Sequence, residues 1–312
     1  MTQTPLQPLS VGNAVSAAFR LYRDRFKSYL IIAIRANLWL LLPLVVILPI
    51  PFLFLLEPVN TSLVGLLALA AIPLGFVGLA KYQANLALIS RLVFGILTNK
   101  PETVEEASRQ VLPKVWKFLR ASLLVGAIIV GIYIAFALCI GLLSVALGGL
   151  VSGAGDGSGI GIAIIFILLI TVATICGIVF LIRFIMRFSI MEVPLAIEDI
   201  NAVTTVRRSW NLTQKNIGRI FAIFLVAGLI TFPLQAIASV LSNVIQAILN
   251  QIIDIENTSP AFLWISVIIS YILGLILSVF FVPFWQAIKA AIYYDLRSRK
   301  EGIDLRLRDR AL

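Results

Sequence analysis

Residues 157–182, GSGIGIAIIFILLITVATICGIVFLI, form a continuous stretch without a charged side chain. A helix needs about 20 mainly apolar residues to cross the ~30 Å hydrocarbon core of a bilayer, so this stretch is long enough to span a membrane. Five other stretches are similarly apolar and also long enough to span a membrane. The six predicted spans are residues 36–56, 58–80, 121–155, 157–182, 220–253 and 257–288.

The overall composition agrees with a membrane protein. Hydrophobic residues make up 60% of the 312 residues and charged residues only 13%, with a mean hydropathy of +1.03. Soluble domains contain about 25% charged residues, so this chain has too little polar surface to enclose a water-soluble core. We expect an all-α polytopic membrane protein in which residues 1–312 form a single membrane domain.

Polar turns join the spans in pairs, which predicts three helical hairpins. The turns, near residues 57–62, 151–159 and 247–260, contain no Lys or Arg, so all 25 basic residues lie at or near the other side of the membrane. Loops rich in Lys and Arg stay in the cytoplasm, so we expect both termini to be cytoplasmic. The net charge of +10 follows from this topology, and we expect no nucleic-acid partner. The acidic residues of the turns are Glu57, Asp156, Asp254 and Glu256.

An amphipathic segment with basic residues precedes each hairpin. The three segments cover residues 10–29, 103–118 and 201–217, and apolar residues recur along them at helical spacing. The second opens with Thr103 and Glu106 in the pattern of a capping box.

These segments have two interpretations. They either mark a threefold internal repeat, or they are the basic residues that precede spans in any multi-spanning protein. A repeat would have units at about residues 10–98, 103–190 and 201–292, followed by a cytoplasmic C-terminal segment at residues 293–312.

Several kinds of chemistry are excluded by composition. The chain has no histidine, which rules out imidazole metal ligands, histidine acid–base catalysis and nucleophiles activated by histidine. Its two cysteines, Cys139 and Cys176, lie within apolar runs, and we expect them to be small buried hydrophobic residues. No catalytic, metal-binding or cofactor-binding residues are predicted, and we expect no cofactor and no enzymatic activity.

Three arginines near the cytoplasmic ends of spans are candidate contacts for an anion or a lipid. Arg35 lies about five residues into the first span, where it either contacts a phosphate or reaches back to the membrane surface as an anchor. Arg183 and Arg187 lie one helical turn apart in the fourth span. Together they either hold a phosphate or simply fix the topology.

The spans also contain prolines but no central carboxylate. Prolines bend helices, and such bends either open a cavity or improve packing. A proton- or sodium-coupled transporter usually carries an acidic residue near the middle of a span, so coupled transport is disfavoured. The prolines are at positions 43, 49, 51, 73, 233 and 283.

Three segments resemble the bacterial glycerophosphoryl diester phosphodiesterase membrane-domain family and related six-span membrane proteins. They are LSVGNAVSAAFRLYRDRFKSYL at residues 9–30, VPLAIEDINAVTTVRRSWNLTQKNIGRIF at 193–221 and AIYYDLRSRKEGIDL at 291–305. The resemblance implies a multi-pass protein of the bacterial inner membrane. Some members of that family carry a phosphodiesterase barrel, and we expect none of that chemistry in this chain, which has no histidine.

The second and third of these segments supply a candidate cytoplasmic collar. We expect the C-terminal segment to dock beneath the helices against residues 207–213, through packing of Trp210 with Tyr294 and through ion pairs. The candidate residues are Trp210, Tyr294, Asp295, Arg297, Arg299 and Glu301.

Two functions remain open. The first is a non-enzymatic membrane scaffold or accessory protein, whose basic cytoplasmic rim interacts with anionic lipid head groups and with a partner complex of unknown identity. The alternative is a transporter or lipid-handling protein with a cavity between the hairpins. A large polar cavity would favour the alternative, and a packed core with a basic underside would favour the scaffold.

The orientation can be tested by labelling single cysteines in intact cells. Cysteines at positions 62, 155 and 257 should react with a membrane-impermeant reagent, because the three hairpin turns lack Lys and Arg. A cysteine replacing Ser298 should not react. Labelling at position 298 in sealed cells would contradict the proposed topology.

Overall fold

The computed structural model describes residues 10–55, 60–153, 159–252 and 260–301, and every element within them is a helix. The four acidic residues of the predicted turns, together with Asp304, lie outside these residues. The helices are α1 (Val11–Asp24), α2 (Phe26–Leu40), α3 (Leu44–Ile47), α4 (Ile50–Leu53), α5 (Thr61–Leu97), α6 (Val104–Val111), the 3-10 helix η1 (Leu112–Lys114), α7 (Val115–Gly153), α8 (Gly159–Phe188), α9 (Glu192–Ile197), α10 (Ala202–Thr213), α11 (Ile217–Ile252) and α12 (Pro260–Glu301).

Within the described residues, five helices are long and apolar enough to cross a membrane, or six if a bent pair is counted as one span. The five are α5, α7, α8, α11 and α12 with their continuations. The chain is therefore a helical polytopic membrane protein. Several of these helices are longer than the predicted spans, because α5 and α12 continue without a break beyond the apolar stretch.

The first predicted span is broken. Helix α2 ends at Leu40, and the short α3 and α4 follow at an angle of 41°. Pro43 and Pro49 precede α3 and α4, and a proline cannot supply the N–H that would continue the preceding helix. The carbonyl of Leu40 accepts a hydrogen bond from the Tyr271 hydroxyl of α12 at 2.8 Å, which satisfies a backbone group exposed by the break. By contrast, Pro73, Pro233 and Pro283 lie inside continuous helices.

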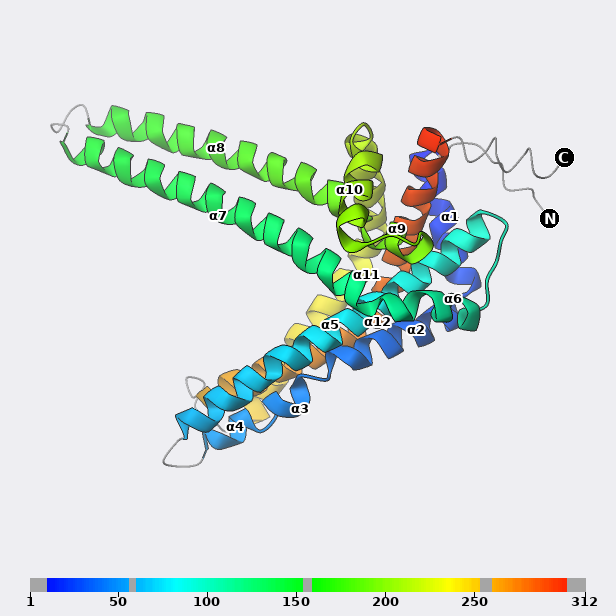
Figure 1. The fold of residues 1–312 in the computed structure, drawn as a ribbon. Helices are drawn as coiled ribbons and strands as arrows, with labels where there is room; N and C mark the ends of the chain where they lie inside the picture. The colour runs from blue at the N-terminus through cyan, green and yellow to red at the C-terminus, as the bar shows by residue number, and fades with distance from the viewer. Residues whose placement is uncertain (1–9, 56–59, 154–158, 253–259, 302–312) are drawn as a thin grey trace.

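Two arms of long helices diverge from a common base (Figure 1). Helices α7 and α8 lie side by side and form one arm. The other arm contains α2 to α4 and the adjoining parts of α5, α11 and α12. The first and last helices, α1 and α12, pack together in the base. We use "the base" for residues 11–29, 84–119, 188–223 and 284–301.

The base holds the packed core. Tyr29, Leu88, Phe118, Leu195 and Tyr293 are each at most 1% exposed and belong to one apolar cluster. The short helices α1, α6 and α10 each bury one face in the base: Ala14 and Ala18 of α1, Val111 of α6 and Leu212 of α10. Their other faces are largely polar and exposed.

The arms expose apolar side chains to their surroundings. Leu138 and Leu142 of α7 are 61% and 71% exposed, and Ile167 of α8 is 65% exposed. An apolar surface of this extent fits contact with lipid, and soluble proteins rarely show it. The expectation that Cys139 and Cys176 are buried is wrong: both are exposed, because α7 and α8 pack mainly against each other.

Local sequence signals start the short helices. The capping box predicted at the start of α6 is confirmed: Thr103 Oγ1 accepts the Glu106 N–H at 3.2 Å, and Glu106 Oε2 accepts the Thr103 N–H at 2.9 Å. Ser10 and Asn201 cap α1 and α10 in a similar way, through their side-chain oxygens. The caps replace hydrogen bonds that the first turn of a helix otherwise lacks.

A glycine sets the distance between α2 and α5. A Cβ atom at Gly78 would lie 2.5 Å from the carbonyl oxygen of Trp39, so the two backbones approach more closely than any other residue would permit. At Gly75, one turn earlier, a Cβ would have no atom within 4 Å.

We therefore expect Gly78→Ala to lower the thermal unfolding midpoint in detergent, since overpacking costs about 1–3 kcal/mol. Gly75→Ala is the matched control. It adds the same methyl group to the same helix, and it should leave the midpoint unchanged or raise it, because alanine favours helix. Equal midpoints for the two variants would show that the α2–α5 contact does not constrain the structure.

Candidate functional site

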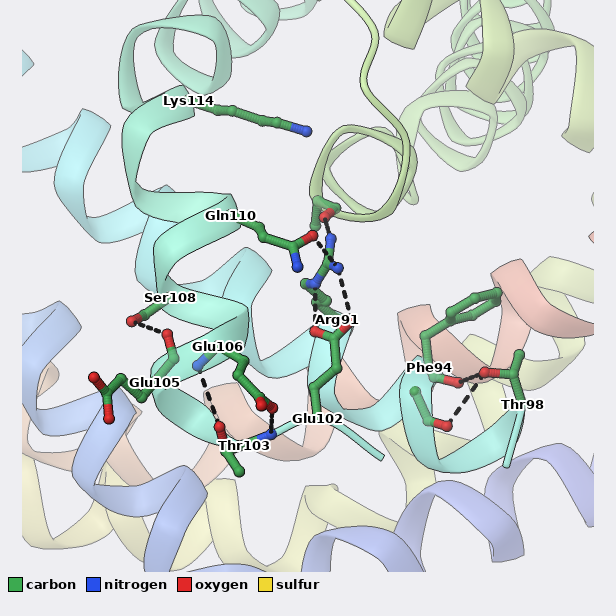
Figure 2. Close-up of polar contacts among 12 residues, drawn as sticks. Arg91, Phe94, Thr98, Glu102, Thr103, Glu105, Glu106, Ser108, Gln110 and Lys114 are labelled. Atoms are coloured by element: carbon green, nitrogen blue, oxygen red, sulfur yellow. Dashed lines mark hydrogen bonds and ion pairs between the residues drawn. The ribbon is translucent and has the colours of Figure 1, made fainter. Parts of the chain in front are cut away.

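Arg91, near the end of α5, joins three other segments of the base (Figure 2). Its guanidinium donates two hydrogen bonds to the carboxylate of Glu102, each 2.7 Å long. It also donates to the carbonyl of Ala196 in α9 at 2.7 Å and to the side chain of Gln110 in α6 at 2.5 Å. A planar guanidinium that pairs with a carboxylate through two bonds fixes both distance and angle. Arg91 thus holds α9 and α6 in place against α5.

A tight turn returns Glu102 to Arg91. After α5 ends, Asn99 adopts a left-handed backbone with a φ of 54°. The N–H of Lys100 then bonds the carbonyl of Gly95, and the N–H of Asn99 bonds that of Ile96, as in a Schellman motif. A Cβ at position 95 would lie 2.7 Å from the Lys100 carbonyl, so the turn requires glycine there.

Glu198 connects α9 to α10 and α12. Its carboxylate accepts a hydrogen bond from Arg208 at 3.0 Å and from the Tyr293 hydroxyl at 2.5 Å, and Arg297 lies 3.9 Å away. Its backbone carbonyl accepts a hydrogen bond from Lys114 at 2.9 Å. The residue therefore bonds side chains from three other elements.

The neighbouring Asp199 is exposed and lies beside two lysines. Lys114 and Lys117 approach its carboxylate to 3.6 and 3.5 Å. The positive charge of Lys114, and then that of Lys117, lowers the pKa of Asp199 below its ordinary value. This carboxylate therefore stays charged to lower pH in the folded chain than in the unfolded one.

Asp295 is a buried carboxylate in α12, with its side chain 1% exposed. Arg219 of α11 donates to it at 2.9 Å, and Arg299 donates at 3.1 Å from one turn further along α12. An unpaired charge at this depth would be strongly destabilising, and the two guanidinium groups compensate it. The pair with Arg219 fastens α11 to α12.

A cavity of about 510 Å³ opens where the two arms leave the base. It lies between α5, α7, α9 and α12. Apolar residues form part of its wall, and its polar lining consists of Tyr82, Gln83, Ser122, Glu192, Gln286 and Lys289.

The polar residues of this cavity form two hydrogen-bonded groups. Glu192 Oε1 accepts bonds from Lys289 Nζ at 2.5 Å and from Gln286 Nε2 at 3.0 Å. Gln286 Oε1 in turn accepts a bond from the buried Ser90 hydroxyl at 2.7 Å. On the opposite wall, the Ser122 hydroxyl donates to the side-chain oxygen of Gln83. The cavity therefore contains one positive and one negative side chain in contact.

Helix α9 places Glu192 at this position. Val193, Leu195 and Ala196 are fully buried against the base. Pro194 falls in the first turn of α9, where its missing N–H breaks no helical hydrogen bond. The packed face fixes the direction of the helix, and Glu192 at its start faces the cavity.

The predicted anion contacts do not converge. Arg35 is exposed on α2 and makes no hydrogen bond or ion pair with another described residue. Arg183 is exposed on α8, beside Ile217 and Phe221. The Arg187 guanidinium stacks on Trp210, with its central carbon 3.9 Å from the ring centroid. Arg183 and Arg187 share a helix, but Arg187 is engaged by α10.

The candidate collar residues occupy two regions of the base. Helix α12 continues to Glu301 and carries Tyr294, Asp295, Arg297 and Arg299. Trp210 packs against Phe184 and Phe188 of α8, while Tyr294 packs against Phe94 of α5. The two aromatic rings thus have different neighbours. Contact between α10 and the end of α12 includes a bond of 2.5 Å from Lys300 Nζ to the Asn211 carbonyl.

None of Arg91, Glu192 and Lys289 is among the site residues predicted from the sequence. Lys289 directly follows the sixth predicted span, and its partner Glu192 is 97 residues away in the chain, so no local pattern connects the two. A usable signal existed at Glu192, which is a lone carboxylate between the apolar runs of α8 and α9. Among the described residues, no three His, Cys, Asp or Glu side chains gather as ligands for a metal ion.

The chain belongs to the family described as Domain of unknown function (DUF7847), which matches residues 31–296. This range contains the cavity and the Arg91, Glu198 and Asp295 clusters. No curated protein matches the chain, and no solved structure matches it.

The Arg91 cluster predicts that Arg91→Lys destabilises the protein. Lysine keeps the charge but lacks the planar fork with which Arg91 makes four hydrogen bonds, two of them to Glu102. An unsatisfied buried group costs about 1–3 kcal/mol. Arg109→Lys is the matched control, because Arg109 pairs with Glu105 while both side chains are 76% exposed. Its effect should stay within about 0.5 kcal/mol. Thermal unfolding in one detergent measures both variants, and equal midpoints would contradict the role of Arg91.

Proposed function

We propose that this member of the DUF7847 family is a non-enzymatic scaffold or accessory protein of the bacterial cytoplasmic membrane. Its base would lie on the cytoplasmic side, bind anionic lipid head groups and offer a surface to a protein partner. Its membrane location follows from the apolar arms. The role, the orientation and the partners are the proposal.

The proposal rests on how charge is divided between the inside and the surface of the base. Glu102, Glu192, Glu198 and Asp295 are each bonded by arginine or lysine within the base. Many other basic residues remain exposed and make no ion pair with a described residue. We call this group the basic rim: Arg20, Arg25, Lys27, Lys100, Arg120, Arg207 and Lys215.

A basic rim of this kind suits an anionic membrane surface. Each Lys or Arg close to such a surface contributes about 1 kcal/mol of attraction, and salt weakens it. We do not propose nucleic acid as a partner of the basic rim, because these basic residues adjoin helices that enter a membrane.

The orientation follows from the same charges. With the base in the cytoplasm, the chain would have six spans arranged as three hairpins, each preceded by an amphipathic helix, namely α1, α6 or α10. The sixth span requires α2 to α4 to cross the membrane together. This arrangement would relate the chain to the glycerophosphoryl diester phosphodiesterase membrane domains. In support, the described residues of the three resembling segments lie in α1, the start of α2, α9, α10, the start of α11 and the end of α12, and nearly all of them belong to the base.

A non-enzymatic role is supported by the hydrogen bonds that three carboxylates of the base accept. Glu198 and Asp295 are each bonded by more than one partner, and Glu102 by both arms of one guanidinium. Carboxylates held in this way fasten helices together, whereas an acid–base catalyst must be able to exchange a proton with a substrate.

A second candidate function is lipid handling or transport, and one observation favours it. The polar cavity is lined by residues of α5, α7, α9 and α12. Helix α7 continues into one arm and helices α5 and α12 into the other (Figure 1), so the cavity adjoins both the base and the apolar helices. A cavity in that place can hold a molecule that is polar at one end and apolar at the other.

The basic rim predicts a measurable preference for anionic lipid. In nanodiscs with equal phosphatidylglycerol and phosphatidylethanolamine, wild-type protein should retain excess phosphatidylglycerol after extraction, as read by mass spectrometry. The triple variant Arg20→Gln, Arg25→Gln, Lys27→Gln should lower this enrichment about tenfold or more at low salt. Asp24→Asn is the control in the same segment, and it should preserve or increase the enrichment. An unchanged lipid ratio in the triple variant would overturn the proposal.

A further inference from the structure

We propose that the cavity between α5, α7, α9 and α12 binds the head group of one zwitterionic phospholipid. The phosphate would contact Lys289, and the primary ammonium would contact Glu192. The inference deepens the second candidate function, lipid handling, and rests on it. It is independent of the basic rim.

Unused hydrogen-bonding capacity faces the cavity. Lys289 Nζ has three N–H donors and spends one on Glu192. Glu192 accepts its two bonds on Oε1, which leaves Oε2 without a bond to a described residue. The Tyr82 hydroxyl and the side-chain nitrogen of Gln83 also have no partner among the described residues, although both residues line the cavity. The site therefore offers several donors and one carboxylate oxygen to an occupant.

The charges select the class of head group. One carboxylate and one ammonium give the cavity no net charge. A zwitterion supplies an opposite charge to each, whereas an anionic head group would pair with Lys289 and be repelled by Glu192. A wholly apolar occupant would remove water from both charges without replacing its hydrogen bonds.

The donors match a phosphate group. Lys289 lies on α12, and Tyr82 and Gln83 lie on α5, so the donors come from two walls of the cavity. A phosphate carries several acceptor oxygens and can bond donors that approach from different sides. The ammonium end would then reach Glu192 on α9, next to Lys289.

The size and surroundings of the cavity fit a head group whose acyl chains lie outside. The volume of about 510 Å³ is within the ~300–1,000 Å³ range of small-ligand sites. Leu86, Val282 and Trp285 supply apolar wall. Beyond Ser122, Leu123 and Leu124 of α7 are 45% and 36% exposed, so an apolar surface continues from the cavity along the arm.

A purely structural role for the Glu192–Lys289 pair makes a different prediction. In that case the pair only fastens α9 to α12, and Tyr82 and Gln83 contribute nothing to lipid binding. Changing these two residues therefore separates the interpretations, and it leaves the ion pair and its folding role intact.

The test uses the full chain in nanodiscs of equal phosphatidylethanolamine and phosphatidylglycerol, with bound lipid counted by native mass spectrometry. Wild-type protein should retain one phosphatidylethanolamine molecule at this site, in addition to the phosphatidylglycerol that the basic rim attracts. The double variant Tyr82→Phe, Gln83→Leu should bind it about tenfold more weakly, because it loses two donors to a charged phosphate. Gln235→Leu, the same glutamine change on α11 away from the cavity, should bind like wild type.

Charge reversal provides a second variant. Glu192→Lys with Lys289→Glu preserves an ion pair but exchanges the two ends of the site, so binding should also fall. A thermal unfolding midpoint close to that of wild type would show that each variant is folded. If the charge-reversed variant does not fold, the double variant Tyr82→Phe, Gln83→Leu still tests the inference. Absence of a retained phosphatidylethanolamine, or undiminished binding of phosphatidylethanolamine in the folded double variant, would each overturn the inference.

The lipid measurements distinguish failure of the basic-rim proposal from failure of the head-group site. Loss of anionic enrichment in the rim variant, with the single phosphatidylethanolamine retained, would support both. The binding measurement does not depend on a transport assay. A protein that binds phosphatidylethanolamine without transporting it would therefore contradict the transport function and leave the proposed binding site intact.

Discussion

Apolar side chains gain little by leaving lipid for one another, and this constraint determines where the protein can be held together. In a bilayer the long helices are solvated by acyl chains as well as by their neighbours. The arm formed by α7 and α8 accordingly stands apart, with most of its apolar residues exposed. The fold must therefore be stabilised mainly by the base, where apolar side chains are buried away from water and charged side chains form ion pairs.

The base achieves this with charged residues that are distant in sequence. Arg91 bonds Glu102 and α9, Glu198 joins α9 to α10 and α12, and Asp295 joins α12 to α11. Helix α9 is the common member of most of these contacts, although it is only six residues long. Its buried apolar face and two carboxylates, Glu192 at its start and Glu198 just after its end, make it the connection between the two arms. The same helix that organises the base also lines the cavity, so packing and the proposed head-group site depend on one element.

The sequence predicted some parts of this arrangement and could not predict others. Long apolar stretches identified the helices that cross the membrane, and Thr103 with Glu106 identified a capping box, because both signals are local. The proline-rich start of the first span indicated bending, but the break after Leu40 depends also on Tyr271 of α12, which bonds the exposed carbonyl. The arginines chosen as candidate contacts, Arg35 and Arg183, remain exposed, whereas Lys289 forms a partly buried ion pair with Glu192. Nothing local to Lys289 distinguishes a surface anchor from the partner of a carboxylate on another helix.

By itself, the sequence determined that the chain is helical and membrane-embedded, because length and hydrophobicity of a stretch suffice for that conclusion. It also determined the separation of basic residues from acidic turns, since charge is read directly from residue type. Only the tertiary structure decided which charges remain on the surface and which are neutralised inside the base. The outcome rests on ion pairs between residues far apart in the chain, such as Glu192 and Lys289, which are 97 residues apart. Their attraction acts only after the helices have brought them within hydrogen-bonding distance.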